Sequence, residues 1–254
     1  MLVLTNAIVL KRIPYSDTSL ICRLFTQDRG KVTILAKGVW RPKKSTGALL
    51  EPVSHIHIQY YHKDSRDIQI LKDAGFLQYY SILRNSLNRI ILGLAVVEMI
   101  DKSTQDSNPH PILYRLSWRV LDELNNEKQN YLCVFLFFLY QLSLRLGFMP
   151  NLSNCRKCNS RIMQGGIDES TGELVCSNCI DSSENKLNSF STLNKLTSLH
   201  LDEIETLSLN RKNLIDSIRL LDVFLSYHIE ELKKVKSMKM IRSILNKEKN
   251  YNFN

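Results

Sequence analysis

The sequence has no long hydrophobic run and no recognisable export signal. Its longest apolar stretch, residues 132–140, has nine residues, whereas a membrane-spanning helix needs about 20. The first residues, MLVLTNAIVLKR, lack the basic segment that precedes the apolar part of a signal peptide. These absences predict a cytoplasmic chain. A reducing compartment also makes a disulfide framework a poor explanation for the six cysteines.

Common catalytic motifs are absent as well. The chain has no H-E-x-x-H and no G-x-S-x-G pattern. Residues 38–45 resemble a phosphate-binding P-loop, but Lys43 replaces its second glycine and Pro42 stiffens the loop where it must curl. No motif of the sequence therefore indicates an enzyme.

Positive charge is present in excess and is unevenly distributed. The 254 residues include 34 Lys and Arg against 25 Asp and Glu, for a net charge of +9. Residues 1–80 carry 12 basic and 6 acidic side chains, residues 81–210 carry 12 and 14, and residues 211–254 carry 10 and 5. Two basic ends around a slightly acidic middle predict two surfaces that face an anionic partner, such as nucleic acid.

The hydrophobic periodicity changes once along the chain. Short segments typical of strands occur at residues 7–10, 20–25, 32–36, 55–61 and 67–71. In the fourth, Ile56, Ile58 and Tyr60 share one face, while His55 and His57 share the other, which we expect to be exposed. Five short strands suit an OB-fold barrel. Apolar residues recur at helical spacing from residue 83 onward.

The predicted fold class is therefore α+β. We expect an OB-fold domain at residues 1–78 and a helical domain at residues 79–254, interrupted at residues 151–186 by a polar, cysteine-rich insertion.

Four cysteines of this insertion form the sharpest motif. Cys155 and Cys158 are separated by two residues, as are Cys176 and Cys179, with seventeen residues between the pairs. This spacing is typical of a four-thiolate Zn²⁺ site. Four thiolates leave no open coordination position, so the predicted zinc ribbon is structural. A pair of redox C-x-x-C motifs is the alternative, but no βαβ pattern surrounds either one.

A second motif is a basic segment that holds no acid between Asp28 and Glu51. It offers cations for phosphates and an aromatic ring for unpaired bases, a combination that OB-folds use on single strands. Its candidate DNA-binding residues are Arg29, Lys31, Lys37, Trp40, Arg41, Lys43 and Lys44. The alternative is a solvated loop with a half-buried Trp40.

A third basic group follows the last long apolar stripe. It consists of Lys233, Lys234, Lys236, Lys239 and Arg242. It is either a second surface for phosphates or an acidic peptide, or a solvated helix end favoured by the helix dipole.

Several stretches together resemble the RecO recombination mediator family of bacteria. They are AIVLKRIPYSDTSLICRLFTQDRGKVTILAKGVWRPKKS, the later LRLGFMPNLSNC, which runs into the first cysteine pair, and FLSYHIEELKKVKSMKMI. The resemblance implies an N-terminal OB-fold and a helical domain with a zinc ribbon. It also assigns DNA contact to the basic residues of an Ala-Lys-Gly-x-x-Arg stretch, here Lys37 and Arg41.

The resemblance further implies a non-enzymatic protein of DNA repair and recombination, cytoplasmic and associated with the nucleoid. Such a protein binds single- and double-stranded DNA and anneals complementary strands. It engages the acidic tail of single-stranded DNA-binding protein and acts with RecR to help load RecA. In some members, arginines on a central helix hold that tail, but the comparable stretch here, CVFLFFLYQL, is apolar.

Two other classes remain open on the sequence. A sequence-specific transcription factor could use the zinc ribbon to recognise one duplex sequence, although Arg156 and Lys157 lie on no clear recognition helix. A zinc-stabilised adapter could bind protein alone, which the acid-free basic segment disfavours.

Overall fold

The structure is a computed structural model and describes residues 1–39, 46–128, 130–148, 151–168, 172–180, 190–207 and 209–247. Internal contacts divide the chain into two compact units, Met1–Asn125 and Asn126–Asn254. The first unit therefore contains the barrel together with the first helices that follow it. The predicted domain boundary at residues 78/79 stays a prediction.

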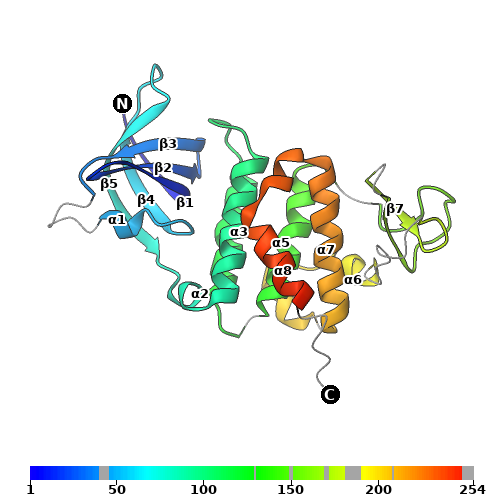
Figure 1. The fold of residues 1–254 in the computed structure, drawn as a ribbon. Coiled ribbons are helices and arrows are strands. Elements are labelled where there is room, and N and C mark those ends of the chain that lie inside the picture. The colour runs from blue at the N-terminus through cyan, green and yellow to red at the C-terminus, as the bar shows by residue number, and fades with distance from the viewer. Residues whose placement is uncertain are drawn as a thin grey trace. The chain divides into compact units, whose positions relative to one another are not determined.

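Five strands of the first unit form a closed barrel in the order β1-β2-β3-β5-β4 (Figure 1). All neighbours pair antiparallel except β3 and β5, which are parallel. This is the five-stranded barrel expected for an OB-fold. The strands are β1 (Leu2–Ser16), β2 (Ser19–Thr26), β3 (Gly30–Ala36), β4 (His55–Tyr61) and β5 (Ile68–Gln78), with the short helix α1 (Thr46–Leu49) between β3 and β4.

Two strands are longer than the sequence pattern indicated. β1 continues through register shifts between Val9 and Lys11 and between Pro14 and Ser16. An irregularity of this kind adds a residue to one strand, so the alternation of inward and outward side chains reverses and the periodic signal is lost. β5 likewise runs to Gln78 and has two shifts against β4.

The barrel core contains the residues that the alternation predicted. Ile56, Ile58 and Tyr60 are all fully buried. At the β2–β3 turn, Gly30 has φ +64°, and a side chain there would overlap the backbone of Asn108. Glycine is therefore required at this turn by conformation and by space.

Three helices complete the first unit. They are α2 (Ser81–Asn85), α3 (Leu87–Ser103) and α4 (Pro111–Leu124), and Pro111 occupies the first turn of α4, where its missing N–H costs nothing. α3 packs against β1.

One histidine of the barrel differs from the prediction. His55 is not fully exposed, because its Nε2 lies 2.8 Å from the Tyr114 hydroxyl and its ring stacks on Trp118, both on α4. His57 is exposed, as predicted.

The second unit is mainly helical. α5 (Tyr131–Arg145) is buried on most of its faces and packs against α7 (Arg211–His228). Its N-cap, Asn130, accepts hydrogen bonds from the backbone N–H groups of Leu132 and Cys133. The remaining elements are β6 (Gly165–Asp168), β7 (Glu173–Cys176), α6 (Phe190–Leu196), η2 (Leu201–Thr206), η3 (Glu230–Lys234) and α8 (Lys236–Lys247). Among the described helices, none is long and apolar enough to span a membrane.

Candidate metal centre and nucleic-acid interface

The two cysteine pairs meet beside the β6–β7 hairpin. The four Sγ atoms of Cys155, Cys158, Cys176 and Cys179 all lie within 4.8 Å of one another, and those of Cys158 and Cys176 are 3.6 Å apart. Zn–S bonds of about 2.3 Å in a tetrahedron place the sulfurs about 3.8 Å apart. The cluster therefore has the donor set and nearly the spacing that a tetrahedral metal ion requires.

Backbone hydrogen bonds shape this cluster. The N–H of Asn159 donates to the Cys155 carbonyl over 2.8 Å, and the N–H of Cys179 donates to the Cys176 carbonyl over 3.0 Å. The N–H of Cys176 also donates to the Cys155 sulfur over 3.2 Å. An N–H that points at a sulfur stabilises its thiolate form, which is the form that binds metal.

The pKa values of the thiols in the cluster differ. Hydrogen bonding from Ser160, whose hydroxyl oxygen lies 2.9 Å from the Cys158 sulfur, lowers the pKa of Cys158 to about 6. The neighbouring Cys158 raises the pKa of Cys179 to about 12. A divalent cation among the four sulfurs would displace the remaining protons.

Charged side chains around the cluster are paired within the hairpin. Arg156 Nε lies 3.1 Å from a Glu173 carboxylate oxygen, and Lys157 Nζ lies 2.8 Å from one of Asp168. Lys157 also donates to the Cys179 carbonyl over 3.3 Å. Arg156 and Lys157 also lie on a turn and not on a recognition helix, which counts against a zinc-ribbon transcription factor.

The residues of the predicted DNA-binding segment fall into three groups. Lys37 is exposed just after β3, and Arg29 is partly exposed at the β2–β3 turn. Lys31 is buried, with only 4% of its side chain exposed. Trp40, Arg41, Lys43 and Lys44 lie outside the described residues.

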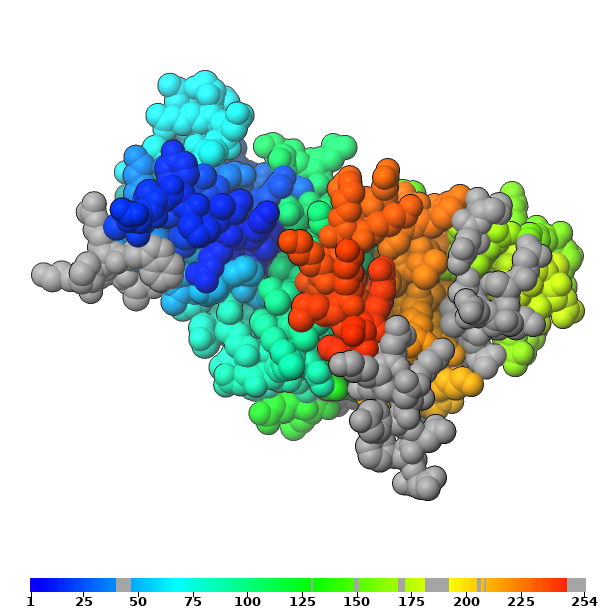
Figure 2. Space-filling model, in the orientation of Figure 1, coloured from blue at the N-terminus to red at the C-terminus, as the bar shows by residue number. Residues whose placement is uncertain are grey.

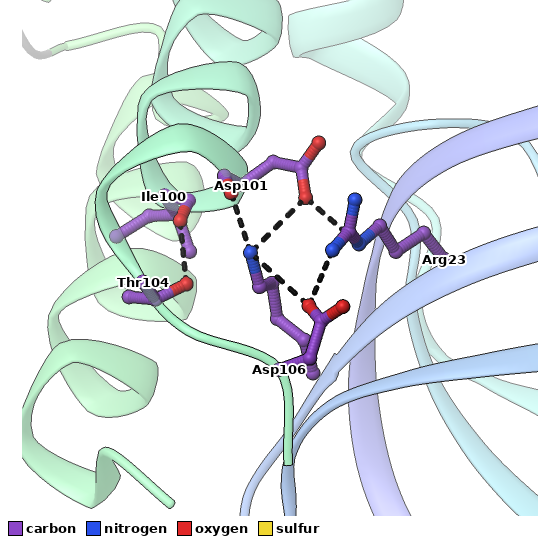
Figure 3. A network of polar contacts seen from close by, with 6 residues as sticks. Arg23, Ile100, Asp101, Thr104 and Asp106 are labelled. Carbon is purple, nitrogen blue, oxygen red and sulfur yellow. Dashed lines mark hydrogen bonds and ion pairs between the residues drawn. The ribbon is translucent and has the colours of Figure 1, made fainter. Parts of the chain in front are cut away.

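Lys31 belongs to an ion-pair network that the sequence did not indicate. Figure 3 shows its partners Asp101 and Asp106 together with Arg23. The Lys31 Nζ lies 3.6 Å from the Asp101 carboxylate and 3.4 Å from that of Asp106, and it donates to the Asp101 carbonyl over 2.6 Å. Arg23 also pairs with both aspartates. Lys31 thus joins β3 to the end of α3 and does not face solvent, so it is no part of an exposed phosphate-binding surface.

The C-terminal basic group is mostly exposed. The segment from η3 to α8 contributes to the surface of the second unit (Figure 2), and Lys233, Lys234, Lys236 and Lys239 are exposed. Lys234 pairs with Glu231 over 3.0 Å.

Arg242 has a different position from these lysines. It makes two hydrogen bonds of 2.5 and 2.8 Å to the carboxylate of Asp222, which is buried on α7. A bidentate pair of this kind fixes α8 to α7. The four lysines are therefore the more exposed part of this basic group.

The fold and the cysteine cluster define a five-stranded-barrel protein with a helical second unit and an inserted four-cysteine hairpin. A family model described as "Recombination protein O N terminal" matches residues 1–80, and one described as "Recombination protein O C terminal" matches residues 84–239. The chain therefore belongs to the RecO family of DNA repair proteins. This family is not a catalytic one.

Curated relatives carry the same name. DNA repair protein RecO of Salinibacter ruber is 37% identical over 155 residues, which cover 61% of this chain and 60% of the relative. DNA repair protein RecO of Desulfatibacillum aliphaticivorans is 28% identical over 252 residues, or 95% of this chain and 97% of the relative. The match thus spans about 60% of the first relative and nearly all of the second.

Proposed function

We propose that this chain binds single- and double-stranded DNA without catalytic turnover and anneals complementary strands. Membership of both parts of the chain in the RecO family carries the proposal. The barrel supports it with exposed Lys37, which lies within the acid-free segment just after β3. The neighbouring Trp40, Arg41, Lys43 and Lys44 are proposed contacts from the sequence alone.

Annealing requires the repulsion between two phosphate backbones to be screened. We propose that the barrel segment supplies one cationic surface and that the exposed lysines at residues 233–239 supply the second. Each surface releases counterions from one strand, so that bases can pair while both backbones are held.

We propose Zn²⁺ as the ion of the cysteine cluster, in a structural role. Four sulfurs at near-tetrahedral spacing support zinc over harder cations, which prefer oxygen. The ion would hold the two cysteine pairs and the β6–β7 hairpin together.

The proposed setting is the bacterial cytoplasm, at the nucleoid. We propose that the protein acts on single strands coated with single-stranded DNA-binding protein, engages the acidic tail of that protein, and works with RecR to help load RecA. A protein-only adapter is the competing class, because the exposed lysines would also suit an acidic peptide.

The test is annealing of two complementary fluorescent oligonucleotides, coated with single-stranded DNA-binding protein, in the absence of ATP. The wild-type chain should accelerate annealing, and a Lys37→Glu/Arg41→Glu variant should lose most of that acceleration. Loss of two phosphate contacts should also reduce the log–log salt slope of single-strand binding by about 1.4.

A matched double reversal, Lys128→Glu/Lys195→Glu, places the same charge change on exposed residues outside the basic segment. It should retain annealing. No DNA binding by the wild-type chain at low salt would overturn the proposal and favour the adapter.

A further inference from the structure

A pocket of about 750 Å³ opens at one end of the barrel. It lies between the β2–β3 turn, the start of β3, the β4–β5 turn and the loop between α3 and α4. All these segments belong to the first unit. The end of the β4–β5 hairpin, which lines the pocket, projects from the barrel and is cyan in Figure 2. Mouths of barrels are common places for small ligands, so the polar groups of this pocket decide what it can hold.

Tyr60 supplies a polar group deep in the pocket. Its side chain is fully buried and lines the pocket, and its hydroxyl has no hydrogen-bond partner among the described residues. Burial raises the pKa of Tyr60, which the charge of Arg29 opposes, so the hydroxyl stays protonated at neutral pH. A buried hydroxyl without a partner is uncommon in folded proteins, and it indicates a missing ligand or water.

His62 provides a second such group. Its Nε2 lies 2.8 Å from the Asp64 carboxylate, whereas its buried Nδ1 has no partner within the described part of the chain. The rings of Tyr60 and His62 meet edge to face, with centroids 6.2 Å apart. The two polar atoms therefore come from neighbouring side chains that line the same pocket.

The rim of the pocket carries positively and negatively charged side chains. The guanidinium groups of Arg29 and Arg66 form no ion pair with any described residue, and neither does the carboxylate of Asp67. The other acids are engaged: Asp28 accepts a hydrogen bond from Thr5 over 3.1 Å, Asp64 contacts His62, and Asp106 is in the network of Figure 3. The unused groups thus include two cations, one carboxylate and two uncharged polar atoms.

We propose that this pocket holds one unpaired nucleotide of a DNA single strand, with its phosphate on Arg29 and Arg66 and its base edge at the Tyr60 hydroxyl. A site for a bare anion would offer donors only, but Asp67 and the Tyr60 oxygen are acceptors. A base has donors and acceptors on one edge and brings its phosphate with it. In a duplex that edge is already paired, so the pocket selects unpaired DNA.

This inference rests on the proposed DNA-binding function and adds a strand preference to it. The test measures binding of a fluorescent oligo(dT) and of a duplex by the full-length chain at several salt concentrations. Tyr60→Phe should weaken oligo(dT) binding by about three- to tenfold, the range expected for a lost hydrogen bond, and should leave duplex binding and the salt slope unchanged. Tyr61→Phe is the matched control, because Tyr61 is exposed and does not line the pocket.

Arg29→Gln/Arg66→Gln should instead reduce the salt slope for oligo(dT), by about 0.7 for each lost phosphate contact. Lys63→Gln, an exposed neutralisation beside the pocket, should change it less. Thymidine monophosphate should compete with oligo(dT) at concentrations where inorganic phosphate does not. Equal competition by phosphate would reduce the site to an anion site and overturn the base contact.

The outcomes separate the two proposals. If the wild-type chain binds oligo(dT) but Tyr60→Phe behaves like Tyr61→Phe, the pocket inference is wrong and the DNA-binding function stands. If the wild-type chain binds no DNA, both fall. Tyr60→Phe should unfold at a midpoint no lower than that of Tyr61→Phe, because it removes a buried hydroxyl that makes no hydrogen bond with the described residues.

Discussion

In the ion-pair network between the barrel and α3, we expect the loss of a carboxylate to lower the free energy of unfolding more than the loss of the lysine. The Lys31 ammonium is buried, and Asp101 and Asp106 are its carboxylate partners. Asp101→Asn removes the less exposed of these, with 18% of its side chain exposed against 62% for Asp106. Removing one partner of a buried pair costs about 3–5 kcal/mol. Because Asp106 and the residue-101 carbonyl remain, we expect about 2–3 kcal/mol.

The reverse deletion should cost less. In Lys31→Met, Asp101 and Asp106 both keep Arg23 as a partner, and a methionine can fill the volume of the lysine stem. The hydrogen bond to the Asp101 carbonyl is lost, which is worth about 1 kcal/mol, and the desolvation of a buried cation is relieved. We therefore expect a net change within about 1 kcal/mol.

Urea unfolding followed by tryptophan fluorescence measures this difference. The two tryptophans of the chain, Trp40 and Trp118, both fall within residues 1–125, so the signal reports the unit that holds the network. With an m-value of about 1–3 kcal/mol/M, Asp101→Asn should lower the midpoint by about 1–2 M and Lys31→Met by much less. A larger loss in Lys31→Met than in Asp101→Asn would refute the reasoning.

Three further predictions concern the metal, pH and the hairpin. Cys158→Ser should reduce bound zinc, measured by metal analysis, from about one ion per chain to well below one, because three thiolates hold it less tightly. Burial lowers the pKa of His55 to about 4, below its unfolded value near 6.5. The stability that it contributes is therefore full above pH 6.5 and falls as the pH drops toward 4, by at most about 3 kcal/mol. His55→Gln should flatten this part of a urea midpoint against pH curve. Gly172 has φ +66° and lies against the Tyr227 ring, so Gly172→Ala should speed zinc loss to a chelator, whereas Gly147→Ala, at φ +81° in open space, should not.

Most of the fold follows from periodic or spaced patterns. Alternation along residues 55–61 predicted which side chains of β4 are buried, and the two C-x2-C pairs predicted the cluster that the structure brings together. Both patterns are local, because residues close in the sequence determine which face of a strand a side chain occupies and whether the two thiols of a C-x2-C pair can reach one ion. The barrel class followed from the number of such strands.

The positions that the sequence did not predict depend on contacts between distant residues. Lys31 belongs to the basic segment by composition, yet its partner Asp101 is 70 residues away and turns it into an internal cation. No spacing rule relates two such residues, since loop closure between them depends on the whole barrel and α3. His55 was misplaced for the same reason: its strand face is outward, but α4 covers it.

The number of basic residues therefore overestimates the number of cations that this protein offers to a partner. Lys31 and Arg242 are among its 34 Lys and Arg residues, but each is paired with carboxylates, Lys31 inside the first unit and Arg242 against buried Asp222 of the second. The charge available to a phosphate backbone is that of exposed residues such as Lys37 and Lys239. The salt dependence of DNA binding counts only these, because an internal ion pair releases no counterion when DNA arrives. Neutralising Lys31 and neutralising Lys37 therefore change two different quantities, the stability of the barrel unit and the proposed affinity for DNA.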